Sequence, residues 1–292
     1  MFLLSPITFP NLGIRIDPDP VAFTVFGKQI YWYGIIIAAG FLMAVLYMMY
    51  RARDFGITSD DALDEVLWTV PIGVICARLY YCIFYWELYA DNPISILYIW
   101  EGGLAIYGGV IGGAITVLVF AKCRKIRPSV LLDLAAMAVI IGQFCGRWGN
   151  FMNREAYGCE TQSFFKMGLT DASGVENFYH PTFLYESVWN LVGFIGLHLL
   201  SKRRRFDGQI FLSYLAWYGL GRVWIEGLRT DSLYLFSTGI RVSQLVAGVS
   251  FLAASGALAY ILLVKKPTPD GLYVNQKKAA QTESEAEKPD KS

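Results

Sequence analysis

Residues 30–50 read IYWYGIIIAAGFLMAVLYMMY, and none of these 21 side chains is charged. A helix rises ~1.5 Å per residue, so ~20 apolar residues cross the ~30 Å hydrocarbon core of a bilayer. Comparable runs recur along the 292 residues, of which 55% are hydrophobic and only 17% are charged. Soluble domains carry about a quarter charged residues. The composition therefore excludes an ordinary cytosolic enzyme and predicts an integral membrane protein.

Seven such runs predict an all-α integral membrane fold, with seven transmembrane helices within residues 1–264. The expected spans cover about residues 30–50, 66–86, 102–121, 129–149, 181–200, 208–228 and 242–264. Residues 265–292 are rich in Lys and Glu and have too little apolar surface to fold alone. We expect them to form a disordered cytoplasmic tail.

The positive charges indicate the orientation of the spans, because cytoplasmic loops are enriched in Lys and Arg. Twelve basic residues follow the first, third, fifth and seventh spans, namely Arg51, Arg53, Lys122, Arg124, Lys125, Arg127, Lys202, Arg203, Arg204, Arg205, Lys265 and Lys266. The loop 87–101, after the second span, has none. This alternation predicts that the N-terminus is outside and the C-terminus inside. Residues 1–29 and the loop 150–180 would form a small cap on the outer face.

The cysteines, the histidines and the net charge do not support a metal site or a nucleic-acid partner. The chain has five cysteines and two histidines, His180 and His198, and lacks the paired spacings typical of zinc ligands. The formal net charge of +1 provides no electrostatic attraction for nucleic acid. We therefore expect no cofactor, no metal and no nucleic-acid partner, and the sequence indicates no oligomeric state.

Ionisable residues inside the expected spans converge at one depth. A charged side chain in a span costs ~2.5–3.5 kcal/mol on insertion scales, so such residues usually face the interior of the bundle. With the N-terminus outside, the residues toward the outer end are Arg78, Arg147, Glu186, Arg222 and Glu226, together with Tyr33 and Tyr107. Only Asp133 belongs to the inner side. This convergence predicts a polar site near the headgroups of the outer leaflet.

Each of these residues also has a purely structural interpretation. Arg222, Glu226 and Arg229 share one helix face and could form a ladder of side chains that reaches the membrane edge. Arg78 could form an ion pair between helices, with Glu186 as a candidate partner. The two tyrosines fit the aromatic belt at the interface between membrane and water.

Residues 146–158, GRWGNFMNREAYG, form the densest polar run at this depth. Non-helical backbone in a membrane is tolerated only where it is buried in protein or lines a polar cavity, and we expect this run to interrupt the fourth span. The planar fork of Arg147 suits a phosphate, and the amides of Asn150 and Asn153 can donate to glycerol or carbonyl oxygens. A capped helix end followed by a turn would explain only residues 149–150.

Residues 100–113, WEGGLAIYGGVIGG, contain six glycines. The spacing of Gly108 and Gly112 is typical of closely packed helices. Gly102 and Gly103 suggest a flexible entry or a re-entrant turn before them. Packing does not require a tyrosine among these glycines, so Tyr107 is a candidate site residue.

The residues alone leave three classes of function open: an enzyme acting on a lipid, a transporter of an anionic solute, and a non-catalytic scaffold. A transporter needs a polar path through the inner halves of the spans, where Asp133 is the only charged group. A scaffold would tolerate a neutral isosteric replacement of Arg147.

The run 146–158 matches G-R-x-G-N-F-x-N-x-E-x-x-G at eight fixed positions and resembles the signature of bacterial prolipoprotein diacylglyceryl transferases. Other blocks similar to that family are YWYG at 31–34, EGG at 101–103 continuing to Gly109, HPTFLYE at 180–186 and GRVWIE at 221–226. The resemblance covers residues 30–264, and the predicted seven-span topology is similar to that of the family.

The resemblance implies a multi-pass protein of the bacterial cell membrane whose active site faces the outer leaflet. Such an enzyme transfers the diacylglyceryl group of phosphatidylglycerol to the lipobox cysteine of a prolipoprotein signal peptide. A thioether forms and glycerol-1-phosphate leaves, which is the first step of lipoprotein maturation. By motif position the functional residues are Tyr33, Arg147, Asn150, Glu155, Gly158, Arg222 and Glu226. Many members carry histidine where Tyr107 stands, so a histidine base cannot be carried over to this chain.

This chemistry assigns an expected role to each candidate residue. Arg147 and Arg222 would stabilise charge on the departing phosphate, and Glu226 would orient Arg222. The expected substrate-binding residues are Arg147, Asn150, Tyr33, Gly158 and Arg222, and the expected catalytic residues are Arg147, Arg222, Glu226, Tyr107 and Glu155. The acceptor thiol, with a pKa of ~8.5, could lose its proton to Tyr107, to Glu155 or to water.

Overall fold

The computed structural model describes residues 6–171, 173–230, 239 and 241–286, with side chains described to residue 283. The chain divides into two compact units, residues 1–46 with 136–269 and residues 47–135 with 270–292. Two helices, α1 (Trp32–Arg51) and α4 (Pro128–Asn153), contribute residues to both units.

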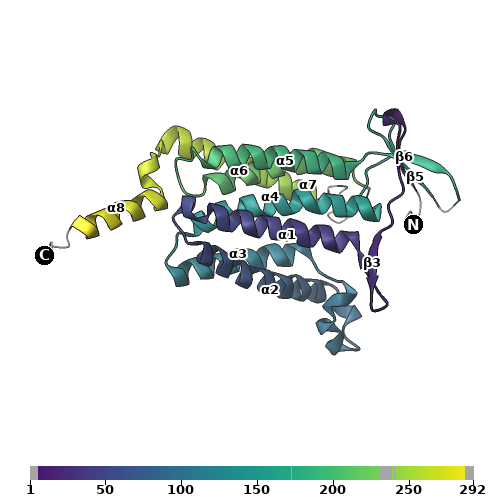
Figure 1. Ribbon diagram of the computed structural model, residues 1–292, viewed down its shortest axis with the longest axis horizontal. Coiled ribbons are helices and arrows are strands. Elements are labelled where there is room, and N and C mark those ends of the chain that lie inside the picture. The colour runs from purple at the N-terminus through teal and green to yellow at the C-terminus, as the bar shows by residue number, and fades with distance from the viewer. Residues whose placement is uncertain (1–5, 172, 231–238, 240, 287–292) are drawn as a thin grey trace. The chain divides into compact units, whose positions relative to one another are not determined.

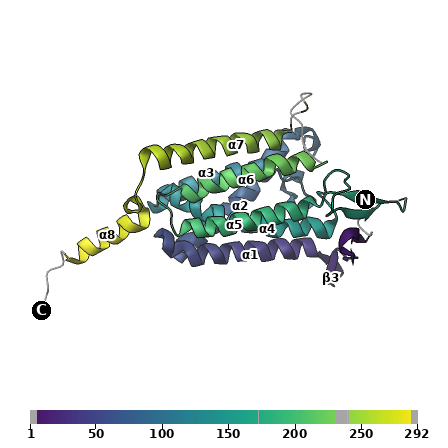
Figure 2. The same ribbon diagram turned by 90° about the horizontal axis from the view of Figure 1, so that it is seen from above.

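The first unit is a helical body that carries a small sheet. Besides most of α1 and the second part of α4, it contains α5 (Thr182–Ser201), α6 (Gln209–Leu228) and α7 (Val242–Ala259). Helix α6 packs against both α5 and α7, and the three run alongside one another in Figures 1 and 2. A π-helical turn, Tyr260–Lys265, extends α7.

The sheet joins the two segments that we expected to form a cap. Its strands are antiparallel in the order β2-β1-β5-β6, with β1 at Ile7–Phe9, β2 at Ile14–Ile16, β5 at Met167–Thr170 and β6 at Glu176–Tyr179. In this register Ile7 lies opposite both Ile16 and Leu169. Strands β3 (Val21–Val25) and β4 (Lys28–Tyr31) form a separate hairpin just before α1.

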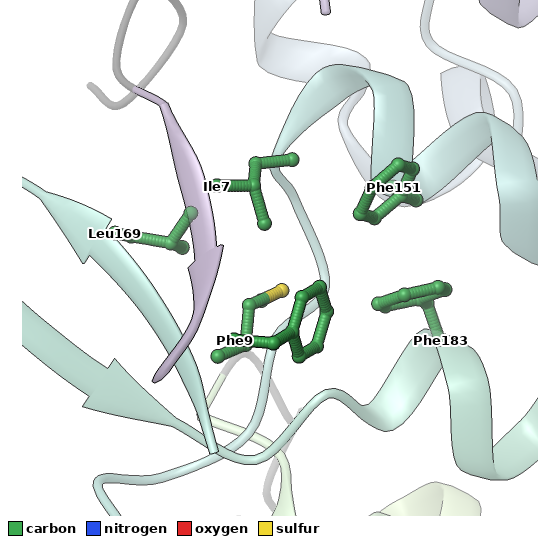
Figure 3. Packing of buried hydrophobic residues seen from close by; sticks show 6 residues of the cluster. Ile7, Phe9, Phe151, Leu169 and Phe183 are labelled. Atoms are coloured by element: carbon green, nitrogen blue, oxygen red, sulfur yellow. The ribbon is translucent and has the colours of Figure 1, made fainter. Parts of the chain in front are cut away.

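A hydrophobic cluster fixes the sheet to the helical body (Figure 3). Its buried members are Ile7, Phe9, Phe151, Met167, Leu169 and Phe183. The rings of Phe151 at the end of α4 and Phe183 at the start of α5 have centroids 4.7 Å apart. Each fully buried side chain of this size stabilises the fold by ~1.5–3 kcal/mol. The end of α4 is therefore held in place by the sheet.

The second unit is built on the closely packed pair α2 (Ser59–Phe84) and α3 (Ile106–Arg124), which lie side by side in Figure 1. A Cβ atom added at Gly108 would lie 2.5 Å from Cβ of Tyr80, and one added at Gly112 would lie 2.6 Å from Cβ of Cys76. The prediction that these glycines serve helix packing is confirmed.

Helix α2 begins seven residues before the expected span, because polar residues extend it. The Oγ1 atom of Thr58 accepts a hydrogen bond from the backbone N–H of Asp61 at 3.0 Å, and the Asp61 carboxylate caps Thr58 in return. This capping box satisfies N–H groups that otherwise have no partner in the first turn. A hydropathy profile alone does not predict the first turn of a helix when that turn is made of polar residues.

Helix α8 (Tyr273–Ala286) lies in the region that we expected to be disordered. Leu272, just before this helix, and Val274, its second residue, are buried in the second unit. Gly56 has a φ of +81°, and a Cβ added there would lie 2.8 Å from Cα of Val274. Arg127 donates to the carbonyl oxygen of Gly271 at 2.9 Å. Two buried side chains and these polar contacts order a segment whose composition predicts disorder.

Among the described residues, six helices are long and apolar enough to cross a membrane, within Trp32–Phe55, Ser59–Phe84, Ile106–Arg124, Pro128–Asn153, Thr182–Ser201 and Val242–Lys265. The protein is therefore an all-α membrane protein apart from its small sheets. Helix α6 matches the sixth expected span, 208–228, in position and length, but its glycines, tryptophans, tyrosines and two charged residues lower its hydropathy.

Candidate active site

Glu186 lies at the centre of three arginines in the first unit. It projects from α5 and is only 4% exposed. One of its oxygens, Oε2, lies 2.5 Å from Nη2 of Arg147 on α4. The other, Oε1, lies 2.8 Å from Nη1 of Arg222 on α6 and 3.5 Å from Nη1 of Arg229. A single carboxylate therefore binds guanidinium groups from three parts of the chain.

Glu226 supplies a second carboxylate one helical turn after Arg222. Its Oε2 atom lies 2.5 Å from Nη2 of Arg222, and the residue is 1% exposed. Arg241, at the start of α7, donates to the backbone carbonyl of Glu226. Arg222 is thus held between two carboxylates, so its guanidinium has one fixed orientation.

A chain of hydrogen bonds leads from Arg147 to Glu155. Nη1 of Arg147 donates to Oδ1 of Asn150 at 3.1 Å, and Nδ2 of Asn150 donates to Oε1 of Glu155 at 2.9 Å. Asn153 donates to the same carboxylate oxygen at 3.4 Å. The Arg147 guanidinium is therefore bound on one side by Glu186 and on another by Asn150, which in turn is oriented by Glu155.

Two tryptophans fix α5 against α6 below this cluster. The indoles of Trp189 and Trp217 stack with centroids 4.3 Å apart. Each Nε1–H donates to the backbone carbonyl of the other tryptophan, both at 3.0 Å. Gly193 and Gly221 lie under the indoles, where a Cβ atom would collide with the opposite ring. This reciprocal arrangement sets the helix register that brings Arg222 to Glu186.

Two further glycines allow close approaches around the site. A Cβ at Gly149 would lie 2.8 Å from the ring of Tyr33, so this tyrosine packs directly on α4 beside Asn150. Gly158 donates its N–H to the carbonyl of His180 at 2.9 Å and pairs with Arg229 as a β-bridge. A Cβ at Gly158 would lie 2.9 Å from the carbonyl oxygen of Leu228. Gly158 therefore joins the end of α6 to the segment that precedes α5.

The cluster combines excess positive charge with limited access to solvent. Three guanidinium groups meet two carboxylates, Glu186 and Glu226. The side chains of Arg147 and Arg222 keep 20% and 15% of their surface exposed. Arginine forks bind phosphate through paired hydrogen bonds, and such bonds are strong where water is scarce. The described residues contain no group of three or more His, Cys, Asp or Glu that could hold a metal ion. The arrangement is suited to a phosphate-bearing lipid.

The sequence profile of the prolipoprotein diacylglyceryl transferase family matches residues 20–260, which is most of the chain. The protein belongs to this family. Among similar proteins, the phosphatidylglycerol–prolipoprotein diacylglyceryl transferase of Enterococcus faecalis is 47% identical over 269 residues, covering 89% of this chain and 95% of that protein.

Two other proteins of the same name are similar over comparable lengths. The one from Limosilactobacillus reuteri is 44% identical, covering 91% of this chain and 98% of its own. The one from Lysinibacillus sphaericus is 41% identical, covering 87% and 96%. The similarity therefore extends over most of this chain and most of each relative.

The structure of this transferase family member brings most of the predicted site residues together. Arg147, Asn150, Glu155, Arg222 and Glu226 all belong to the network around Glu186. Tyr33 packs beside it, whereas Gly158 contacts backbone and has no room for a side chain. Tyr107 is the second residue of α3, in the second unit.

The expected interruption of the fourth span is wrong. Helix α4 continues to Asn153, and only residues 154–158 leave the helical path. Glycine costs a helix ~1 kcal/mol relative to alanine, but here Gly149 admits the ring of Tyr33 and packing offsets the cost. The site is therefore built mainly on helical backbone, with a short turn after it.

Two members of the cluster, Glu186 and Arg229, are absent from the predicted site residues. From the sequence, Glu186 was a candidate ion-pair partner of Arg78, and Arg229 a candidate member of a ladder that reaches the membrane edge. Depth is the signal that could have found them, because Glu186 and Arg222 lie at similar distances from the outer ends of their expected spans. Arg78 instead donates to backbone carbonyls within the second unit.

Proposed function

We propose that this protein transfers the diacylglyceryl group of phosphatidylglycerol to the lipobox cysteine of prolipoproteins. The thiolate sulfur attacks the glycerol carbon that bears the phosphate, a carbon–sulfur bond forms, and the carbon–oxygen bond to the phosphate breaks. The electron pair of that bond leaves with glycerol-1-phosphate, and the product is a thioether. The observation that carries the proposal is the arginine cluster around Glu186 in a chain of this family.

Arg147 and Arg222 would bind the phosphate and stabilise the charge that grows on it during bond cleavage. Each is already oriented by a carboxylate, so little reorganisation is needed when the substrate binds. Glu186 and Glu226 are positioning residues in this proposal, since they are buried and hold the arginines. Arg229 adds positive charge to the same site.

Asn150 and Tyr33 would contact the remainder of the lipid headgroup. The Nδ2 atom of Asn150 donates to Glu155 and its Oδ1 atom accepts from Arg147, so the amide orientation is fixed. Tyr33, on α1, packs on Gly149, the residue of α4 that precedes Asn150. The side chain of Tyr33 is partly exposed. These two side chains lie at the end of α4 where the arginine forks are found.

Three acceptors are compatible with removal of the thiol proton: Tyr107, Glu155 and water. Tyr107→Phe and Glu155→Gln separate them through the pH dependence of turnover. A general base must be deprotonated to act, so loss of the rise in turnover with increasing pH in one variant identifies that side chain as the base. If both variants keep the pH profile of the unaltered protein, water accepts the thiol proton. Water is a sufficient acceptor once nearby cations lower the pKa of the thiol.

The proposed setting is the bacterial cell membrane, with seven spans, the N-terminus outside and the C-terminus inside. Six apolar helices support a multi-pass protein, and the basic residues that follow alternate spans support the orientation. In this orientation the arginine cluster and the sheet face the outer leaflet. There the lipid headgroup and the lipobox of a translocated precursor are both accessible.

Purified full-length protein in detergent, supplied with phosphatidylglycerol and a lipobox peptide, tests the proposal. We expect release of glycerol phosphate together with a gain of one diacylglyceryl group in the peptide mass. A peptide whose cysteine is replaced by serine is the matched control and should give neither signal. A folded protein that binds the lipid but transfers nothing would overturn the proposal in favour of an anion transporter.

A further inference from the structure

The segment between α2 and α3, residues 85–105, is irregular and strongly apolar on its surface. It contains three short 3-10 turns at Trp86–Leu88, Pro93–Leu97 and Ile99–Glu101. Its large exposed side chains include Trp86, Leu88, Ile94, Leu97, Trp100 and Leu104, and Trp100 is 75% exposed. We call residues 85–105 the linking segment.

Arg78 holds the linking segment from α2. This arginine is only 5% exposed, and every nitrogen of its guanidinium donates to a backbone carbonyl. Nε donates to Ile96 at 2.9 Å and Nη1 to Gly102 at 2.6 Å, while Nη2 donates to Ser95 at 2.7 Å. Longer bonds reach the carbonyls of Gly103 and Tyr98, at 3.1 and 3.4 Å. One side chain therefore satisfies five carbonyls.

Other contacts complete this arrangement, which we call the Arg78 clamp. The guanidinium carbon lies 5.0 Å from the ring centroid of Tyr89, a buried residue of the segment. The N–H of Ala105 donates to the carbonyl of Ala77 at 3.1 Å, which joins the end of the segment to α2. A Cβ at Gly103 would collide with Nη1 of Arg78. The glycine is needed because the clamp leaves no space for a side chain.

This arrangement has a consequence for where the segment can lie. Irregular backbone in lipid is unstable when its polar groups lack partners, at a cost of several kcal/mol for each group. The Arg78 clamp provides partners for five carbonyls of the linking segment. Many of the outward side chains are apolar or aromatic, and Trp and Tyr are the residues enriched where membrane meets water.

We propose that the linking segment lies in the lipid interface at this end of α2 and α3, as a membrane anchor held in shape by the Arg78 clamp. Lipid is the partner that covers its apolar surface. Both flanking helices are membrane spans by length and composition, so the lipid around these helices continues onto the linking segment. Its acidic residues, Glu87, Asp91 and Glu101, are exposed and would remain at the aqueous edge. This proposal is independent of the transferase reaction.

Fluorescence quenching in liposomes tests the position of the segment. Trp100→Cys is labelled with an environment-sensitive fluorophore in a chain whose exposed native cysteines, Cys123 and Cys159, are replaced by serine. The parent without the new cysteine gives the background. Asp91→Cys is the matched control because it lies in the same segment, is exposed and is charged.

We expect lipids that carry a nitroxide near the headgroup to quench the label at position 100. We also expect iodide to quench this label much less than it quenches the label at position 91. Equal iodide quenching at the two positions, with no effect of the nitroxide lipids at position 100, would overturn the proposal. That outcome would mean that the apolar surface is open to water and awaits a protein partner.

Arg78→Lys tests the clamp with the charge retained. A lysine has three donors on one nitrogen and cannot reach five carbonyls in these directions. We expect iodide quenching at position 100 to rise several-fold and proteolysis within residues 85–105 to become faster, with the spans intact by circular dichroism. If neither quantity changes in the folded variant, the Arg78 clamp does not hold the segment. If the variant does not fold, the quenching measured with Arg78 present still decides where the segment lies.

Discussion

Two arginine sites in the described part of the chain, the Arg78 clamp and the cluster around Glu186, differ in what the arginine binds. Arg78 is surrounded by neutral carbonyls of the linking segment, and all its nitrogens are used. Arg147 and Arg222 bind carboxylates and keep part of their surface exposed. An arginine whose donors are all taken by backbone is a structural element. An arginine that is oriented by an acid but still exposed can bind a further anion.

The largest effect is expected from removing the charge at the centre of the cluster. Glu186→Gln leaves three guanidinium groups close together without their shared carboxylate, which should lower the free energy of unfolding by about 3 kcal/mol. The midpoint of thermal unfolding in detergent measures this loss. Glu160→Gln, at an exposed carboxylate of the same unit, should leave the midpoint unchanged. Equal midpoints for both variants would mean that the cluster does not depend on Glu186.

The two arginine sites should also separate in catalysis. Arg147→Lys replaces a planar fork by a point charge at the proposed phosphate site, and we expect kcat/KM to fall by about 10²-fold or more. Arg53→Lys, at an exposed residue near the end of α1, serves as the control. Glycerol phosphate release measures both. Turnover of Arg147→Lys equal to that of the control would remove Arg147 from the phosphate site.

Neighbouring glycines sharpen the description of the Arg78 clamp. Gly102 and Gly103 both have positive φ, +90° and +70°, so alanine is strained at either position by about 1–3 kcal/mol. Only Gly103 also faces Arg78 and Tyr81, while Gly102 is open within 4 Å. We expect Gly103→Ala to lower the thermal midpoint more than Gly102→Ala. Equal losses would show that the space beside Arg78 is not tightly filled.

The smallest effect is expected at His180, beside Gly158. Burial lowers the pKa of His180 below its ordinary value of ~6.5. As the pH falls through ~6.5, His180 binds a proton in the unfolded chain before it does so in the folded chain. The contribution of His180 to the free energy of unfolding is therefore fully present above this pH and declines below it.

His180→Asn should remove this part of the pH dependence. Thermal midpoints at about pH 7.5 and about pH 5 should differ less for His180→Asn than for the unaltered protein. Because the side chain is only partly buried, the difference should be small. An identical pH dependence in the two proteins would mean that His180 titrates as it does in the unfolded chain.

The sequence predicts the helices well and the partners of the charged residues poorly. The charge-free run at 30–50 becomes α1, Trp32–Arg51, because a long apolar stretch has few other stable structures. The start of α2 was missed because a capping box extends it through polar residues. Similarly, α4 continues through Gly149, since packing against Tyr33 outweighs the low helix propensity of glycine.

The candidate site was predicted as a set of residues at one depth, not as a network. Arg147, Arg222 and Glu226 could be predicted because charges in apolar runs are costly and therefore conspicuous. Glu186 was detected, but its partner was not, since helix rotation decides which of several arginines it meets. The role of Arg78 was not predictable at all, because its acceptors are backbone carbonyls and any residue type supplies one.

The reciprocal tryptophan pair has a consequence for motion in the first unit. Sliding α5 along α6 by one residue, ~1.5 Å, would break two indole hydrogen bonds and move both rings out of the spaces above Gly193 and Gly221. These contacts therefore oppose sliding of one helix along the other. In the proposed reaction, a lipid would therefore reach the arginine cluster without shear between α5 and α6.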